Sequence, residues 1–105
     1  MLDKKYRLPS SSFLTKYTIS TPLFTLKVGD NLGIKRFGFV VSKKIDKRAV
    51  ARNYIKRIFR ASVQNLVSEV GTGKDFLFIV KKNAVGQSQQ KIEGEIKNTL
   101  TKYFK

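Results

Sequence analysis

The stretch from residue 37 to residue 60, FGFVVSKKIDKRAVARNYIKRIFR, constrains the fold more than any other part of the sequence. It opens with a short apolar run, Phe37 to Val41, which is typical of a mostly buried strand. Beyond Asp46, a residue suited to an N-cap, apolar residues recur at intervals of three and four. The predicted packing face contains Val50, Ala51, Tyr54, Ile55, Ile58, Phe59, Ser62 and Leu66. The sequence therefore predicts a buried strand that leads into a long amphipathic helix.

The other half of this predicted helix is cationic. Its polar residues are Arg52, Asn53, Lys56, Arg57 and Arg60. A solvated face usually mixes charges of both signs, but no acidic residue occurs between Asp46 and Glu69, so cations four residues apart repel one another. Lys47 and Arg48 also lie where the helix dipole disfavours each cation by about 0.3 to 1 kcal/mol. A bound polyanion relieves both costs, so the pattern favours a nucleic-acid-binding surface.

Composition supports the same interpretation. The 105 residues include 22 Lys and Arg against 7 Asp and Glu, a formal charge of +15. Such a charge favours a polyanionic partner, with nucleic acid ahead of an anionic membrane. Hydrophobic residues make up 41% of the chain, enough for the core of one domain spanning residues 1–105.

Several classes of chemistry are excluded by the residues themselves. The chain has no Cys and no His, which excludes thiol catalysis, disulfides, Cys or His metal sites and a His general base. Its few acidic residues are scattered over different predicted elements, so no set of carboxylates converges on a catalytic metal. No apolar run reaches the length of a membrane span, and the N-terminus lacks the apolar core of a signal peptide, so we expect a cytoplasmic protein.

In the N-terminal third, the sequence predicts a basic arm over residues 1–7. It also predicts a short helix that is capped by Ser10 and carries Phe13 and Tyr17 on one face. These two rings are either core residues or exposed binding residues. The segment Phe24 to Val28 alternates as a half-buried strand, and turn residues follow it. We therefore predict an antiparallel hairpin between this strand and the strand that ends at Ser42.

In the C-terminal third, the sequence predicts a central strand from Phe76 to Val80 and a last helix capped by Ser88. The apolar positions of that helix are Ile92, Ile96, Leu100 and either Tyr103 or Phe104. The predicted order is thus α-β-β-α-β-α, an α+β fold in which helices pack on a small mixed sheet. General topology rules predict a right-handed crossover through the basic helix.

The residues RNYIKRIFR at 52–60, preceded by VVSKKI at 40–45, resemble the signature of the bacterial ribonuclease P protein subunit. The family usually has a third basic residue where this chain has Tyr54. The resemblance implies a ribosomal-protein-S5-domain-2-like fold with a left-handed crossover at the basic helix, and we adopt that handedness.

The resemblance also implies a function: the protein binds the catalytic RNA subunit of ribonuclease P and the 5′ leader of precursor tRNA. It implies that the protein alone is not catalytic, that Mg²⁺ is held mainly by the RNA, and that the protein is a monomer within the ribonucleoprotein. The implied RNA-binding residues are Lys43, Lys44, Arg48, Arg52, Asn53, Lys56, Arg57 and Arg60. The implied leader-binding residues are Phe13, Tyr17 and Lys27, although relatives can carry an aromatic residue near Lys27.

Two other classes of function compete with this one. A ribosomal or other structural RNA-binding protein shares the size and charge, but it is not expected to have the offsets seen from Arg52 to Arg60. A sequence-specific DNA-binding protein needs a second helix just before the basic one, where this chain has a predicted strand.

Overall fold

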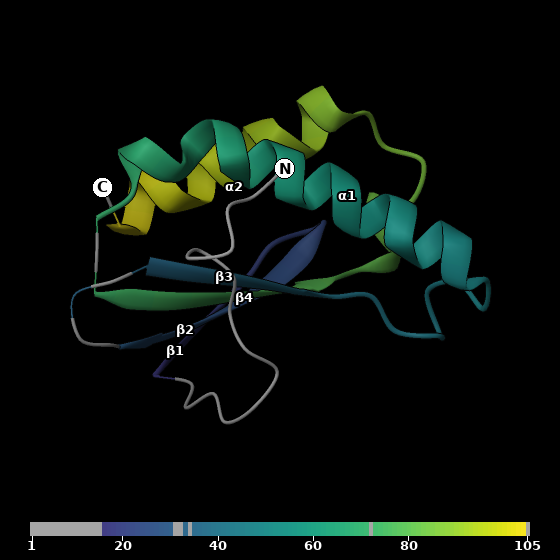
Figure 1. Cartoon of the computed structure of the whole chain (residues 1–105), viewed down its shortest axis with the longest axis horizontal. Helices are drawn as coiled ribbons and strands as arrows, with labels where there is room; N and C mark the ends of the chain where they lie inside the picture. The colour runs from purple at the N-terminus through teal and green to yellow at the C-terminus, as the bar shows by residue number, and fades with distance from the viewer. Residues whose placement is uncertain (1–15, 31–32, 34, 72, 105) are drawn as a thin grey trace.

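The computed structural model describes residues 16–30, 33, 35–71 and 73–104. A four-stranded sheet carries two long helices on one of its faces (Figure 1). The elements are β1 (Tyr17–Ser20), β2 (Phe24–Asp30), β3 (Lys35–Val40), α1 (Ala49–Leu66), β4 (Lys74–Val80) and α2 (Gln89–Phe104). Short 3-10 turns follow α1 at Val67–Glu69 and β4 at Lys82–Ala84. The predicted α+β class with a mixed sheet is confirmed.

The strand order is β1-β2-β4-β3. β2 pairs with β1 and β4 in antiparallel fashion, whereas β3 pairs with β4 in parallel. The predicted hairpin between β2 and β3 is therefore wrong, because β4 lies between them. β4 is apolar on both faces and takes a central position, as predicted, and α1 makes the crossover from β3 to β4. The left-handed sense of that crossover stays a prediction from the family resemblance.

The N-terminal region departs from its predicted helix. Tyr17 is the first residue of β1, an edge strand whose register with β2 pairs Tyr17 with Val28 and Ile19 with Leu26. The assignment of Tyr17 to a helix is wrong, because pairing with β2 satisfies the backbone of this segment. The predicted arm over residues 1–7 and the helix beginning at Ser10, with Phe13, lie outside the described residues.

The helix α1 has a shorter buried face than its periodicity predicts. Its buried residues are Ile55, Phe59, Ser62, Val63 and Leu66. Val50 and Tyr54, which were assigned to the packing face, are 82% and 60% exposed. Figure 1 shows the reason: the N-terminal turns of α1 extend past the end of the sheet, so no strand lies beneath them.

The core between sheet and helices is built largely from phenylalanine rings. Phe59 of α1 meets the ring of Phe24 edge-on, with 6.1 Å between centroids. Phe37 of β3 stacks on Phe76 of β4 at 5.2 Å. In α2, Ile92, Ile96 and Leu100 are buried as predicted, while Tyr103 is 51% exposed. The predicted cap of α2 is confirmed, since the Lys91 backbone N–H donates to the Ser88 hydroxyl at 3.2 Å.

Candidate nucleic-acid interface

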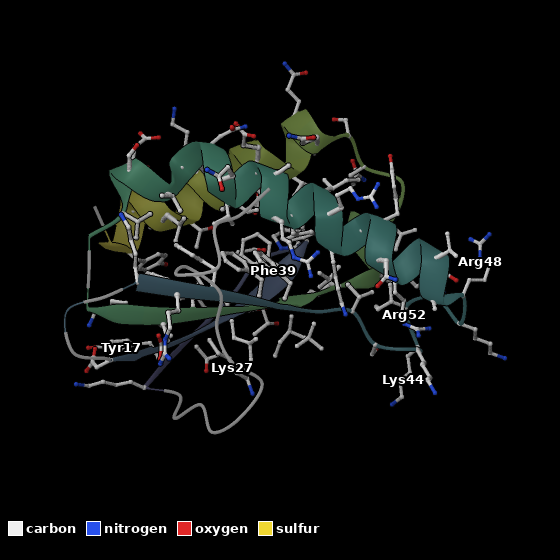
Figure 2. The ribbon with its side chains drawn as sticks, in the orientation of Figure 1. Tyr17, Lys27, Phe39, Lys44, Arg48 and Arg52 are labelled. Carbon is white, nitrogen blue, oxygen red and sulfur yellow. The ribbon has the colours of Figure 1, made fainter. Side chains whose placement is uncertain are left out.

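The cationic residues just before α1 and at its start gather at the end of the molecule where this helix begins. The turn after β3 closes with a hydrogen bond from the Ile45 N–H to the Ser42 carbonyl at 3.0 Å. That turn leaves Lys43 and Lys44 exposed. Figure 2 shows Lys44, Arg48 and Arg52 close to one another at this end. The structure thus extends the cationic face of α1 onto the preceding loop.

Asp46 has a role other than the predicted N-cap. The residue before α1 is Arg48, and no side chain caps the helix. The Asp46 carboxylate instead accepts hydrogen bonds from the Arg48 backbone N–H at 2.9 Å and from its guanidinium at 3.0 and 3.2 Å. These bonds lower the pKa of Asp46 to about 2. The ionised carboxylate therefore orients Arg48, whose side chain stays 79% exposed.

Arg52 is partly a structural residue. Its Nη1 donates to the backbone carbonyls of Asp46 at 3.1 Å and of Lys47 at 2.8 Å. These bonds tie the loop to the second turn of α1, and the residue is half-buried. Arg52 therefore holds the loop in place in addition to contributing positive charge.

The remaining predicted residues lie farther along α1. Asn53, Arg57 and Arg60, together with Ala61, line a surface hollow of about 420 Å³. Lys56 is half-buried on the same helix, and α1 contains no acidic residue. The uncapped N-terminus of α1 adds the positive end of the helix dipole. The arrangement suits a track of phosphate groups, because nothing on the helix neutralises its cations.

The predicted leader-binding residues are not brought together. Lys27 is adjacent to Val28 in β2, so its side chain lies on the opposite face of the sheet from Val28 and from Tyr17, the partner of Val28. Figure 2 shows Lys27 pointing away from the helices. The prediction that Tyr17 and Lys27 line one groove is therefore wrong, and Phe13 lies outside the described residues.

Tyr17 instead lies beside a cluster of charges at the edge of the sheet. It is 47% exposed, so of the two alternatives for this ring the structure excludes a core position. The Nζ atoms of Lys16 and Lys74 lie 6.0 and 5.6 Å from the ring centroid. Both ammonium groups also bind the Asp30 carboxylate, at 2.7 and 2.5 Å, and these hydrogen bonds lower the pKa of Asp30 to about 2.

Sequence reasoning did not separate binding cations from structural ones. The Lys35 ammonium donates to the carbonyls of Val67 and Val70, just after α1. Arg36 and Asp75 form a two-point ion pair across β3 and β4, with both N···O distances at 2.8 Å. Lys35 and Arg36 lie inside β3, two residues before the strand that the sequence predicts, so the sequence did not set them apart from the loop cations.

Sequence reasoning also missed a second hollow, of about 260 Å³, between α1 and the loop before α2. Tyr54 and Ile58 form part of one wall, and Val85 and Gln87 part of the other. The sequence signal that points to it is Tyr54 itself, an aromatic residue close to the cations of α1.

Among the residues that the structure describes, no group of three or more His, Cys, Asp or Glu could hold a metal ion. Within the same ranges, no helix has both the length and the apolar character needed to span a membrane.

Comparisons with known proteins agree with this geometry. The Ribonuclease P family model matches residues 4–104. A ribonuclease P protein component of Microcystis aeruginosa is 36% identical over 73 residues, covering 70% of this chain and 61% of the relative. One from Bacillus cereus strain Q1 is 41% identical over 70 residues, covering 67% of this chain and 56% of the relative. The aligned segment thus spans less than two thirds of each relative's length.

Solved structures give the same result. A Staphylococcus aureus RNase P protein matches with a TM-score of 0.71 and 26% identity, covering 81% of this chain and 78% of that one. The RNase P protein from Thermotoga maritima matches in fold, with a TM-score of 0.75 and 21% identity over 82% of each chain. Because the family model covers nearly the whole sequence, this chain belongs to the ribonuclease P protein family.

Proposed function

We propose that this protein is the protein subunit of a cytoplasmic ribonuclease P in which a partner RNA performs the cleavage. The protein binds that RNA and the 5′ leader of precursor tRNA, and so supports removal of the leader to give the mature tRNA 5′ end. The observation that carries the proposal is the cationic face of α1, which has no acidic residue of its own.

The RNA subunit binds along this face. The contact residues are Lys43, Lys44, Arg48, Arg52, Asn53, Lys56, Arg57 and Arg60. Each phosphate that they neutralise releases counterions, which makes the affinity depend on salt concentration. Asn53 can donate and accept hydrogen bonds at once, so it orients a backbone or a base edge. One protein monomer per RNA suffices for this contact.

The leader lies on the sheet face that the helices leave open. Alternation along β2 and β4 places Lys27, Leu77 and Ile79 on this face, and all three are half-buried. Val40 of β3, opposite Ile79, is 41% exposed there. An apolar floor with a cation suits a single strand, which needs both surface for its bases and charge for its phosphates.

Catalysis belongs to the RNA, with Mg²⁺ held mainly by RNA phosphates and none by protein side chains alone. The arrangement of the described carboxylates supports this assignment. Asp30 binds Lys16 and Lys74, Asp46 binds Arg48, and Asp75 binds Arg36. Each of these three aspartates is thus engaged by a cation of the protein, and the three lie on β2, on the loop before α1 and on β4.

Sequencing the RNA that copurifies with the tagged protein from its own cells tests the proposal. We expect one abundant structured RNA together with precursor tRNAs that retain their 5′ leaders. An excess of ribosomal RNA would instead support a ribosomal role, and recovery of neither kind of RNA would leave a DNA-binding protein. A variant with Arg57 and Arg60 both changed to Ala serves as the control for nonspecific capture.

A further inference from the structure

The hollow between α1 and the loop before α2 is the feature that the proposed phosphate contacts leave unexplained. Its walls include Tyr54 and Ile58 on one side and Val85 and Gln87 on the other, and Asp46 and Arg48 also line it. Its volume is about 260 Å³. Pockets for drug-sized ligands enclose about 300 to 1,000 Å³, so this hollow suits a single ring system.

The apolar surface around the hollow is incompletely covered. Tyr54 is 60% exposed and Val85 is 40% exposed, and each lies on a separate element. Exposed apolar residues that converge on one hollow favour a ligand with an apolar surface of its own. The flat ring of Tyr54 favours in particular a flat aromatic partner.

The surroundings of Tyr54 favour RNA as the source of that partner. Asn53 precedes it in the chain, and Arg57 follows one turn later, so the ring borders the proposed phosphate track. Arg48 is held beside the hollow by two hydrogen bonds from its guanidinium to Asp46. Gln87 adds an amide that both donates and accepts. An apolar wall, a fixed cation and an amide match the three parts of a nucleotide: base face, phosphate and base edge.

We propose that this hollow takes one unpaired base of the RNA bound along α1, which stacks on Tyr54 while Arg48 contacts a phosphate of the same nucleotide. The inference rests on the proposed function, because it assigns one further contact with the same RNA. It also explains Tyr54 in place of a basic residue: one phosphate contact is exchanged for one stacking contact.

The test compares Tyr54→Ala and Tyr54→Phe with the unchanged protein in binding to the transcribed RNA subunit at several salt concentrations. Base stacking on an aromatic residue is worth about 1 to 3 kcal/mol, so Tyr54→Ala should weaken binding about 5- to 150-fold. The slope of log affinity against log salt should stay unchanged, because no charge is lost. Tyr54→Phe should bind like the unchanged protein, since it keeps the ring.

Tyr103→Ala is the matched control, because it removes a tyrosine of similar exposure from the far end of α2. It should leave affinity for the RNA subunit unchanged. Chemical probing of the RNA bases supplies a direct readout: one base protected by the unchanged protein and by Tyr54→Phe should become reactive with Tyr54→Ala.

Equal affinities of all variants, with no base changing its reactivity, would overturn this inference while leaving the proposed function intact. Failure of the unchanged protein to bind the RNA subunit would overturn both. A loss of affinity in Tyr54→Phe equal to that in Tyr54→Ala would also contradict stacking, because it would assign the effect to the hydroxyl group.

Discussion

At the scale of single residues, the basic side chains divide into those that hold the fold and those that face solvent. The ammonium of Lys81, for example, donates to the Ser20 hydroxyl and the Thr21 carbonyl, both at 2.7 Å, and so joins β4 to the turn after β1. Arg57, in contrast, is exposed and has no hydrogen bond or ion pair with the described part of the chain. Only the second kind is free to bind RNA at no cost to folding.

This division predicts different outcomes for two arginines on the same helix. Arg57→Ala should reduce the salt slope of RNA affinity by about 0.7 to 0.9 and leave the free energy of unfolding unchanged. Arg52→Ala should flatten the slope and also lower the free energy of unfolding by about 1 kcal/mol, because two backbone carbonyls lose their donor. Filter binding across a salt series and urea unfolding measure the two effects. Identical stability of the two variants would contradict the structural role of Arg52.

The residue pattern of α1 was predictable only in part. The three-and-four spacing correctly identified Ile55, Phe59, Ser62 and Leu66 as buried. It failed for Val50 and Tyr54, since periodicity states which residues share a face but not where the supporting sheet ends. The cationic residues were identified from the absence of acids nearby, a signal that is fully present in the sequence.

At the scale of elements, β2, β3 and β4 were predictable as strands, whereas β1 and the strand pairing were not. The apolar runs at Phe24 to Val28 and Phe76 to Val80 correctly predicted strands. The pairing of β2 with β4 depends on contacts between residues about fifty positions apart, and no local turn signal reports them. The same limit explains why Tyr17 was wrongly expected to line one groove with Lys27. The sheet face on which Tyr17 lies is set by its register with Val28.

Under the proposed function, the open face of the sheet distinguishes precursor tRNA from mature tRNA. Lys27→Ala should weaken binding of precursor tRNA by the assembled enzyme and leave binding of mature tRNA unchanged, because only the precursor has a leader to cross the open face. Lys91→Ala, which removes an exposed cation from α2, serves as the matched control. Equal weakening for both tRNAs would show that the leader does not contact Lys27.

At the junction of β1, β2 and β4, the ion pairs of Asp30 should make the stability of the protein depend on pH. The folded protein holds the pKa of Asp30 at about 2, below its ordinary value of 3.8, through hydrogen bonds from Lys16 and then Lys74. This contribution is fully present above about pH 4 and is lost as the pH falls toward about 2. The melting temperature of Asp30→Asn should therefore fall less than that of the unchanged protein between these values. Parallel melting curves for the two proteins would contradict a linkage through Asp30.

At the scale of the whole molecule, the protein is small and strongly cationic, with a formal charge of +15, and its two exposed sides differ in character. The side of α1 away from the core carries the charge, and the open sheet face carries apolar residues with Lys27 (Figures 1 and 2). The described carboxylates that bind cations are spread over separate elements. Under the proposed function, binding belongs to the protein and bond cleavage belongs to the partner RNA.

The cleavage of precursor tRNA by purified components tests this assignment most directly. The protein stripped of RNA, the transcribed RNA subunit and their mixture are each incubated with 5′-labelled precursor tRNA at a fixed Mg²⁺ concentration and near-physiological salt. The protein alone should release no leader, and its addition to the RNA subunit should increase cleavage at the mature 5′ end. Site-specific cleavage by the protein alone, surviving nuclease treatment and denaturing repurification, would contradict the account.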